Sequence, residues 1–214
     1  MAEGLRERNK REKLERARKA ARELFSRQGF EATTIRQIAE RAGIGLGTLY
    51  SYVQNKHELL DQLFYEQWSQ VEDAAYAALP EGAGLVDALL HVFGTMVDSY
   101  AQDLELSKTF VRETLFPTAG TPEERLERTM RVLGRLAGLV EQAQARGEVA
   151  QDVEPLAAAT NLFGLYLLHL MGWFSGMGTR EEFLERLRAS LELQMRGLGP
   201  AGAGVTTPRR RSRT

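Results

Sequence analysis

Two helix-start signals stand on either side of a glycine-rich stretch near the N-terminus. Thr34 is followed three residues later by Gln37, and Asn55 is followed three residues later by Glu58. In such a capping box, the first side chain accepts a hydrogen bond from a free backbone N–H at the helix start, and the second side chain reaches back. Because residues 46–53 have room for about two helical turns, the pattern predicts a helix, a tight turn, a short helix and a longer helix.

Three glycines, Gly43, Gly45 and Gly47, fill the predicted turn and the start of the short helix. Gly43 stands where a helix ends in a positive φ, which glycine adopts without a steric penalty. Gly47 lets the backbone approach a neighbouring surface closely, and DNA is such a surface because its phosphates accept hydrogen bonds from free backbone N–H groups. The pattern therefore favours a DNA-binding helix-turn-helix.

Charged residues are divided unevenly along the chain. Residues 1–56 hold 13 Lys and Arg against 7 Asp and Glu, a net charge of +6. Residues 57–199 hold 11 against 22, a net charge of −11, and four arginines follow in the tail. A basic module joined to an acidic one favours nucleic-acid binding at the N-terminal end, although a solvated charged helix gives the same composition.

Apolar residues recur at helical spacing along the rest of the chain. A first helix ends at Gly29, and further helices are expected at 85–101, 104–116, 121–147, 156–177 and from Thr179 onward. The expected fold is all-α, with a three-helix helix-turn-helix domain at residues 1–56 and a larger helical bundle at residues 57–197. Residues 198–214 are typical of a flexible Arg-rich tail.

The residue types that most enzymes and metal sites need are missing or scattered. The chain has no cysteine and three separate histidines, with no G-x-S-x-G elbow and no P-loop. We therefore expect no catalytic residues, no metal site and no cofactor. The charged N-terminal segment does not resemble a signal peptide, so we expect a cytoplasmic protein. Polar residues interrupt the apolar 156–177 stretch, which predicts a helix buried in protein and no membrane partner.

The stretch TTIRQIAERAGIGLGTLYSYVQNKHELL, residues 33–60, resembles the DNA-binding domain of the TetR family of bacterial transcriptional regulators. The likeness covers about residues 12–62 and includes the A-x-x-A-G-[VI] second helix, the T-x-Y recognition helix and the N-K-x-x-L-L start of the fourth helix. It implies a homodimeric repressor that binds an inverted-repeat operator in double-stranded DNA and is released by a small apolar or amphipathic ligand. Residues 57–197 would form the ligand-binding and dimerisation domain.

The resemblance also implies which residues contact DNA. They are Thr34 and Tyr50 at phosphates, Tyr52 and Lys56 bracing the backbone, Leu46, Gly47, Thr48 and Ser51 toward base edges, and Arg36 at a base or a phosphate. Two alternatives stay open, because Thr34 also fits a simple cap and Tyr50 a packing role. The basic arm from Arg6 to Lys19 fits contact with the DNA backbone or minor groove, and it equally fits an exposed helix with i,i+4 pairs.

The last two predicted helices carry the expected dimer interface. An apolar helix with no polar side fits packing on its own domain and on a partner at once, and TetR-like proteins are similar in pairing two such helices from each subunit as a four-helix bundle. The expected interface residues are Leu167, Met171, Phe174, Leu184, Leu187 and Leu191. A monomer with a thick core is the alternative.

Aromatic residues on successive helices could line a ligand cavity. The candidate pocket residues are Phe93, Met96, Tyr100, Phe110, Phe116, Phe163, Tyr166, His169 and Trp173. Each aromatic residue also fits an ordinary core position, and the His169 ring requires a polar partner that is either a ligand or a neighbouring group. The alternatives to a ligand-responsive repressor are a ligand-independent DNA-binding regulator with a filled core and a purely protein-binding helical scaffold.

Overall fold

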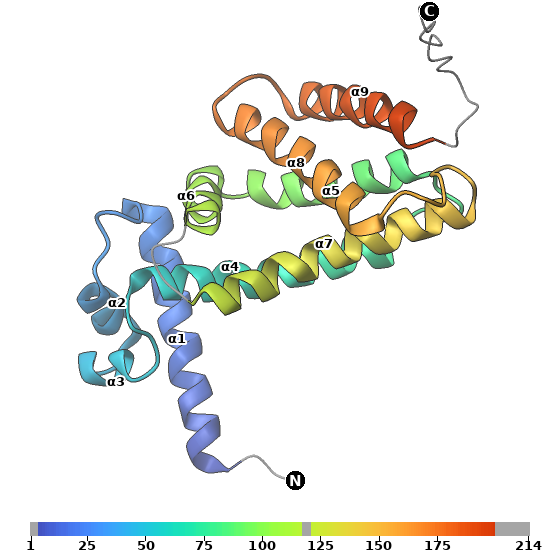
Figure 1. The fold of residues 1–214 in the computed structure, drawn as a ribbon. Helices are drawn as coiled ribbons and strands as arrows, with labels where there is room; N and C mark the ends of the chain where they lie inside the picture. The colour runs from blue at the N-terminus through green and yellow to red at the C-terminus, as the bar shows by residue number, and fades with distance from the viewer. Residues whose placement is uncertain (1–3, 117–120, 200–214) are drawn as a thin grey trace, which may run out of the picture. The chain divides into compact units, whose positions relative to one another are not determined.

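The computed structural model describes residues 4–116 and 121–199, and this part of the chain contains helices and no strand. The helices are α1 Leu5–Gln28, α2 Ile35–Ala42, α3 Leu46–Tyr50, α4 Lys56–Ala77, α5 Leu85–Ala101, α6 Leu104–Leu115, α7 Pro122–Ala145, α8 Pro155–Phe174 and α9 Arg180–Leu198 (Figure 1). The predicted all-α fold is confirmed. The predicted tail lies, from residue 200 on, outside the described residues.

The chain divides into two compact units. Unit 1 consists of Met1–Ala78 and Thr95–Arg125, and unit 2 consists of Leu79–Gly94 and Leu126–Thr214. Unit 1 therefore holds α1 to α4 together with α6, and the division falls within α5. The expected domain boundary at residue 56 is the first residue of α4, whereas the packing of unit 1 continues along that helix.

Of the two predicted helix-start signals, the Thr34 box forms in full and the Asn55 box forms in half, because the Glu58 carboxylate accepts from the Gln54 N–H at 2.7 Å instead of the Asn55 N–H. Thr34 and Gln37 complete both halves of the capping box of α2, and Gly43 ends that helix in the left-handed region at φ 64°. The Asn55 side chain accepts a hydrogen bond from the backbone N–H of Glu58 at the start of α4. The short helix α3 ends earlier than predicted, at Tyr50, and the chain turns before Val53.

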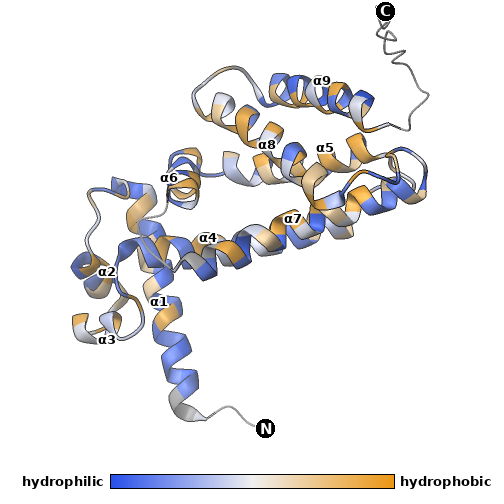
Figure 2. Ribbon diagram, viewed as in Figure 1, coloured by the Kyte–Doolittle hydropathy of each residue, from blue (hydrophilic) through white to orange (hydrophobic). Residues whose placement is uncertain are grey.

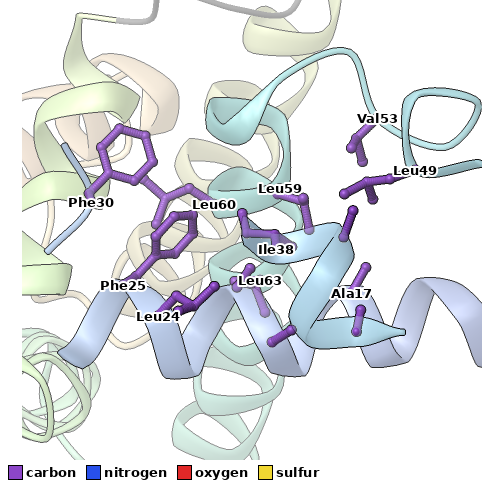
Figure 3. Close-up of a cluster of buried hydrophobic side chains, with 14 of the residues drawn as sticks. Ala17, Leu24, Phe25, Phe30, Ile38, Leu49, Val53, Leu59, Leu60 and Leu63 are labelled. Atoms are coloured by element: carbon purple, nitrogen blue, oxygen red, sulfur yellow. The ribbon is translucent and has the colours of Figure 1, made fainter. Parts of the chain in front are cut away.

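The core of unit 1 forms where α1, α2, α3 and α4 meet (Figure 3). Ile38 from α2, Leu49 from α3 and Leu59 from α4 are all fully buried. Leu63 of α4 and Leu106 of α6 belong to the same cluster. A small helix-turn-helix thus obtains enough buried apolar surface only by including the first two turns of α4 and part of α6.

Unit 2 is built around α8 and α9, which pack along each other. Thr179 and Glu182 form the capping box predicted for α9. Elsewhere in the unit, the Glu148 carboxylate accepts a hydrogen bond from the backbone N–H of Leu85 at 2.7 Å and so holds the start of α5. That pairing joins residues 63 positions apart, so no local sequence pattern signals it.

Helix α8 is buried along one face only. By length and composition it would qualify as a membrane-crossing helix, and 28% of its most apolar window is buried inside the protein. Leu162, Tyr166 and Leu170 face the core of unit 2, whereas Leu168 and Met171 are 66% and 51% exposed. The expectation of a buried helix thus holds for one side of α8, and Figure 2 shows hydrophobic residues recurring along the helix between paler and bluer ones.

Two residues of the expected dimer interface face the core of their own subunit. Leu187 and Leu191 of α9 are fully buried in the core of unit 2, so they have no surface left for a partner subunit. Leu184 is half-buried and lies against α5, where one of its methyl carbons would be 3.5 Å from a Cβ placed on Gly94. The apolar stripe of α9 was predicted correctly, but its partner is the same chain.

Candidate DNA-binding interface

Helix α3 is held on unit 1 by a few apolar side chains. Leu49 is fully buried, and Val53, three residues after the helix ends, is 2% exposed. Leu46 and Tyr52 are half-buried and pack against the same core. These two residues, expected near DNA, therefore use much of their side-chain surface to pack α3 against the core.

Of the remaining expected DNA contacts, Gly47, Tyr50 and Ser51 are exposed, whereas Thr48 is half-buried. Gly47 is exposed, and a Cβ placed on it would meet no atom within 4 Å. Tyr50 is 54% exposed, which sets aside the alternative of a packed tyrosine. The Ser51 hydroxyl donates a hydrogen bond to the Thr48 carbonyl oxygen at 2.7 Å. Its hydroxyl proton is thus engaged, and Ser51 presents an acceptor to the outside.

Thr34 and Arg36 lie at the start of α2. The Thr34 hydroxyl accepts a hydrogen bond from the Gln37 backbone N–H at 3.2 Å, and the Gln37 side-chain oxygen accepts one from the Thr34 N–H at 2.9 Å. The capping role of Thr34 is therefore confirmed, while its side chain stays exposed. Arg36 is exposed and makes no ion pair with any described residue, which leaves its guanidinium available to an external acceptor.

Lys56 is engaged inside unit 1 rather than projecting from it. Its Nζ donates hydrogen bonds to the carbonyl oxygens of Phe30 at 2.8 Å and of Glu31 at 3.1 Å. The same ammonium lies 4.4 Å from the centre of the Phe30 ring. Lys56 thus fastens the start of α4 to the loop between α1 and α2, and it holds the helix-turn-helix together by charge-assisted bonds.

A set of polar and aromatic contacts ties α6 to the helix-turn-helix, and sequence reasoning missed it. Arg112 of α6 pairs with Glu31 at 3.2 Å, and Glu113 contacts His57 Nδ1 at 2.9 Å. The Phe64 ring of α4 stacks on Phe110 of α6 with centroids 4.4 Å apart. A further hydrogen bond runs from Ser26 of α1 to Asp103. Because the partners lie on separate helices, periodicity within one helix cannot reveal them.

The expected pocket residues fall into two groups, one in each unit. In unit 2, Phe93 stacks on Tyr166 with ring centroids 4.2 Å apart and planes 8° from parallel. His169 Nε2 lies 2.9 Å from Ser190 Oγ, so the polar partner of that ring is a neighbouring side chain. Burial, together with the nearby Arg186 charge, lowers the pKa of His169 and favours a neutral imidazole.

The second group of expected pocket residues belongs to unit 1. Met96, Tyr100 and Phe110 are buried there, whereas Phe116, at the end of α6, is 72% exposed. Phe116 therefore does not belong with the buried residues. In unit 2, Phe163 and Trp173 are half-buried. A ligand cavity among these side chains stays a prediction.

Comparisons with known proteins agree with this geometry. A model of the family described as bacterial regulatory proteins, tetR family, matches residues 18–63. The HTH-type transcriptional repressor KstR of Rhodococcus jostii is 24% identical over 182 residues, which cover 85% of this chain and 82% of that protein. The fatty acid metabolism regulator protein of Bacillus subtilis is 25% identical over 145 residues, covering 68% of this chain and 75% of that protein.

A solved structure shares the fold. Thermus thermophilus FadR, a TetR-family transcriptional repressor in complex with lauroyl-CoA, matches with a TM-score of 0.69 and 24% sequence identity. The match covers 90% of this chain and 99% of that one. The helical arrangement described above is therefore shared along nearly the whole of that protein.

The engaged position of Lys56 leads to a stability prediction. Lys56→Met keeps the apolar stem but removes both carbonyl hydrogen bonds, so it should lower the free energy of unfolding by about 1.5–3 kcal/mol. Lys108→Met is the matched control, because it breaks only the surface pair with Glu105 at 2.8 Å and should change stability by less than about 1 kcal/mol. Urea unfolding measures both. Unchanged stability together with weakened DNA binding would show that Lys56 contacts a phosphate directly.

Proposed function

The chain belongs to the TetR family of bacterial transcriptional regulators, and from this premise we propose that it represses transcription as a homodimer bound to an inverted-repeat operator. The observation that carries the proposal is the division of α3 into a buried side, anchored by Leu49, and an open side with Gly47 and Tyr50. The buried side holds such a helix in place, and its open side is free to enter a major groove. Such a regulator acts on DNA in the bacterial cytoplasm.

The side chains of α2 and α3 have two roles in DNA binding, phosphate contact and base contact. Tyr50 and Thr34 hold phosphates, which fixes the position of α3 but carries no sequence information. Thr48 and Arg36 read base edges, with Gly47 letting the backbone come close and Ser51 accepting a hydrogen bond. Lys56 supports these contacts by fixing the α1–α2 loop, next to the Thr34 cap. Leu46 and Tyr52 contribute mainly by anchoring.

A second copy of the chain covers the exposed face of α8. Leu168 and Met171 are exposed on this face, and Gly164 beside them has open space above it. On α9, Leu193 is also exposed. An exposed apolar surface of this kind marks an association site, and two-fold pairing across it gives two recognition helices for two half-sites. Leu167 and Phe174, both half-buried on α8, lie at the margin of this interface.

We assign the release signal to an amphipathic ligand with a long acyl chain. One line of support is the apolar and aromatic character of α5 and α8. The other is that two similar proteins are named as a fatty acid metabolism regulator and as a repressor in complex with lauroyl-CoA. Within unit 1, a displacement of α6 would be transmitted to the helix-turn-helix, because Arg112 and Glu113 are bonded to Glu31 and His57.

A second candidate is a regulator that works without a ligand. The closed stack of Phe93 on Tyr166 and the pairing of His169 with Ser190 favour it, because both contacts complete a core with no ligand present. The protein-binding scaffold has no such support, since it gives no reason for an anchored α3 with an open outer side.

The operator-binding assignment predicts two kinds of mutant. Tyr50→Phe should weaken binding two- to tenfold on every operator variant, because it removes one phosphate hydrogen bond. Thr48→Ala should instead change which base is preferred at one operator position. Both are measured on sequences selected from a random DNA pool. Tyr65→Phe, which removes a hydroxyl from α4, is the control. If both α3 variants bind and select DNA as the wild type does, the assignment is wrong.

The dimer assignment predicts a monomeric variant. Leu168→Glu combined with Met171→Glu places charges on the exposed face of α8, where burial against a partner would desolvate them. Sedimentation should show a folded monomer that has lost specific operator binding. Leu126→Glu makes the same change at an exposed leucine of α7 and should leave the dimer intact. A double variant that stays dimeric would place the interface elsewhere.

Ligand release distinguishes the two candidates. Lauroyl-CoA added to the operator complex should weaken DNA binding at least tenfold, which requires about 1.4 kcal/mol of differential binding between the two states. Acetyl-CoA, with the same head group and no long chain, should have no effect. His169→Leu should change the concentration of lauroyl-CoA needed but not the ligand-free affinity. No release by acyl-CoA of any chain length would favour the ligand-independent regulator.

A further inference from the structure

Helix α1 extends well beyond the core of unit 1. Its first fully buried residue is Ala17, and Leu14 is only partly buried. The turns before them, from residue 5 to residue 13, correspond to about 13 Å of helix. Figures 1 and 2 show this half of α1 projecting past α2 and α3 as a hydrophilic segment. Packing within unit 1 does not explain why the helix continues there.

The projecting turns carry cations on the same side of α1 that packs into the core. Ala17, Ala20 and Leu24 form the buried stripe of α1. Side chains four and seven residues before Ala17 lie on the same face of a helix, and these positions hold Lys13 and Lys10. The inward face of α1 thus changes from apolar to basic where the core ends.

Two acidic residues of the N-terminal half of α1, Glu12 and Glu15, lie on the other side and are already paired. Glu12 accepts a hydrogen bond from Arg8 at 3.0 Å, and Glu15 accepts one from Arg18 at 2.7 Å. By contrast, Lys10 and Lys13 make no hydrogen bond or ion pair with any described residue. The charge on the inward face is therefore not neutralised within the described chain, whereas Arg8 and Arg18 are each paired with a carboxylate.

A third cation links this face to the helix-turn-helix. The Arg16 guanidinium lies 4.0 Å from a Cβ placed on Gly43, the residue that begins the turn between α2 and α3. Lys10, Lys13 and Arg16, which we call the α1 basic stripe, therefore run from the projecting turns to the edge of the DNA-reading element. Their axial span is about 9 Å, the length of two to three nucleotides of one DNA strand.

We propose that the α1 basic stripe binds the phosphate backbone of the DNA that flanks the bases read by α3. The inference rests on the proposed operator binding and extends its footprint beyond the helix-turn-helix. Residues 6–13 contain no apolar side chain, so these turns have no face to insert into a lipid surface. A row of unpaired cations beside a DNA-reading helix matches phosphates, which attract positive charge without regard to sequence.

The test removes two cations from the stripe. Lys10→Ala combined with Lys13→Ala keeps the helix, because alanine is a strong helix former. The slope of log affinity against log salt should become shallower by about 1.8 units, since each phosphate contact contributes about 0.9. The ratio of the wild-type DNA affinity to the DNA affinity of the variant should therefore fall about twelvefold between 50 and 200 mM salt.

The matched control sits on the same helix. Lys19→Ala combined with Arg22→Ala removes the same charge from exposed positions on the opposite side of α1, and it should change the slope by less than about half a unit, well below the value for one contact. An equal change in both variants would show a general charge effect and overturn the proposal. Shortening the operator to the bases read by α3 should abolish the difference between the wild type and the stripe variant.

The outcomes separate this inference from the proposed function. If the wild type binds its operator and the stripe variant has the same salt slope, the stripe is not a DNA contact and operator binding stands. If the difference persists on the shortened operator, the flanking location is wrong. If the wild type binds no selected DNA at any salt concentration, both proposals fail.

Discussion

The burial of Leu49 is the constraint on which the DNA-binding geometry depends. A helix of five residues is too short to be stable in water by itself, so α3 exists only because its inward side chain is fixed in the core formed by α1, α2 and α4. The position of every outward group on α3 is therefore set by packing beneath it. This dependence also explains why α4 and α6 contribute Leu59 and Leu106 to the same core, since residues 1–56 alone would expose part of it.

Local signals in the sequence were enough to predict the helix starts but not the contacts between helices. The Thr34 box and the Gly43 stop involve residues at most four positions apart, and backbone geometry determines their outcome. Lys56 was expected at DNA because the resemblance to the TetR family places a backbone contact at its position. Its two carbonyl partners lie about 25 residues earlier in the chain, and nothing in the spacing indicates that the chain brings them together.

The same limit of local sequence patterns explains why leucines of α9 that were expected at the dimer interface lie in the core. A stripe such as Leu184, Leu187 and Leu191 shows that α9 has an apolar face, but periodicity does not say whether that face meets its own chain or a partner. The answer depended on α8, which packs on α9 with one face and leaves Leu168 and Met171 exposed on another. Aromatic residues raise the same question for ligands, because a ring that lines a cavity and a ring that fills a core have identical sequence signatures.

Charge distribution decides which part of the chain can approach DNA. Residues 57–199 carry a net charge of −11, and like charges repel the phosphate backbone over roughly a Debye length, about 8–10 Å at ordinary salt. The cations of residues 1–56 therefore have to supply the attraction. Some of them are already engaged, Lys56 with carbonyl oxygens and Arg41 with Glu23. Arg36 and the α1 basic stripe are among the cations that make no hydrogen bond or ion pair with any described residue, and the proposed phosphate contact would give the projecting turns of α1 a function that protein packing does not.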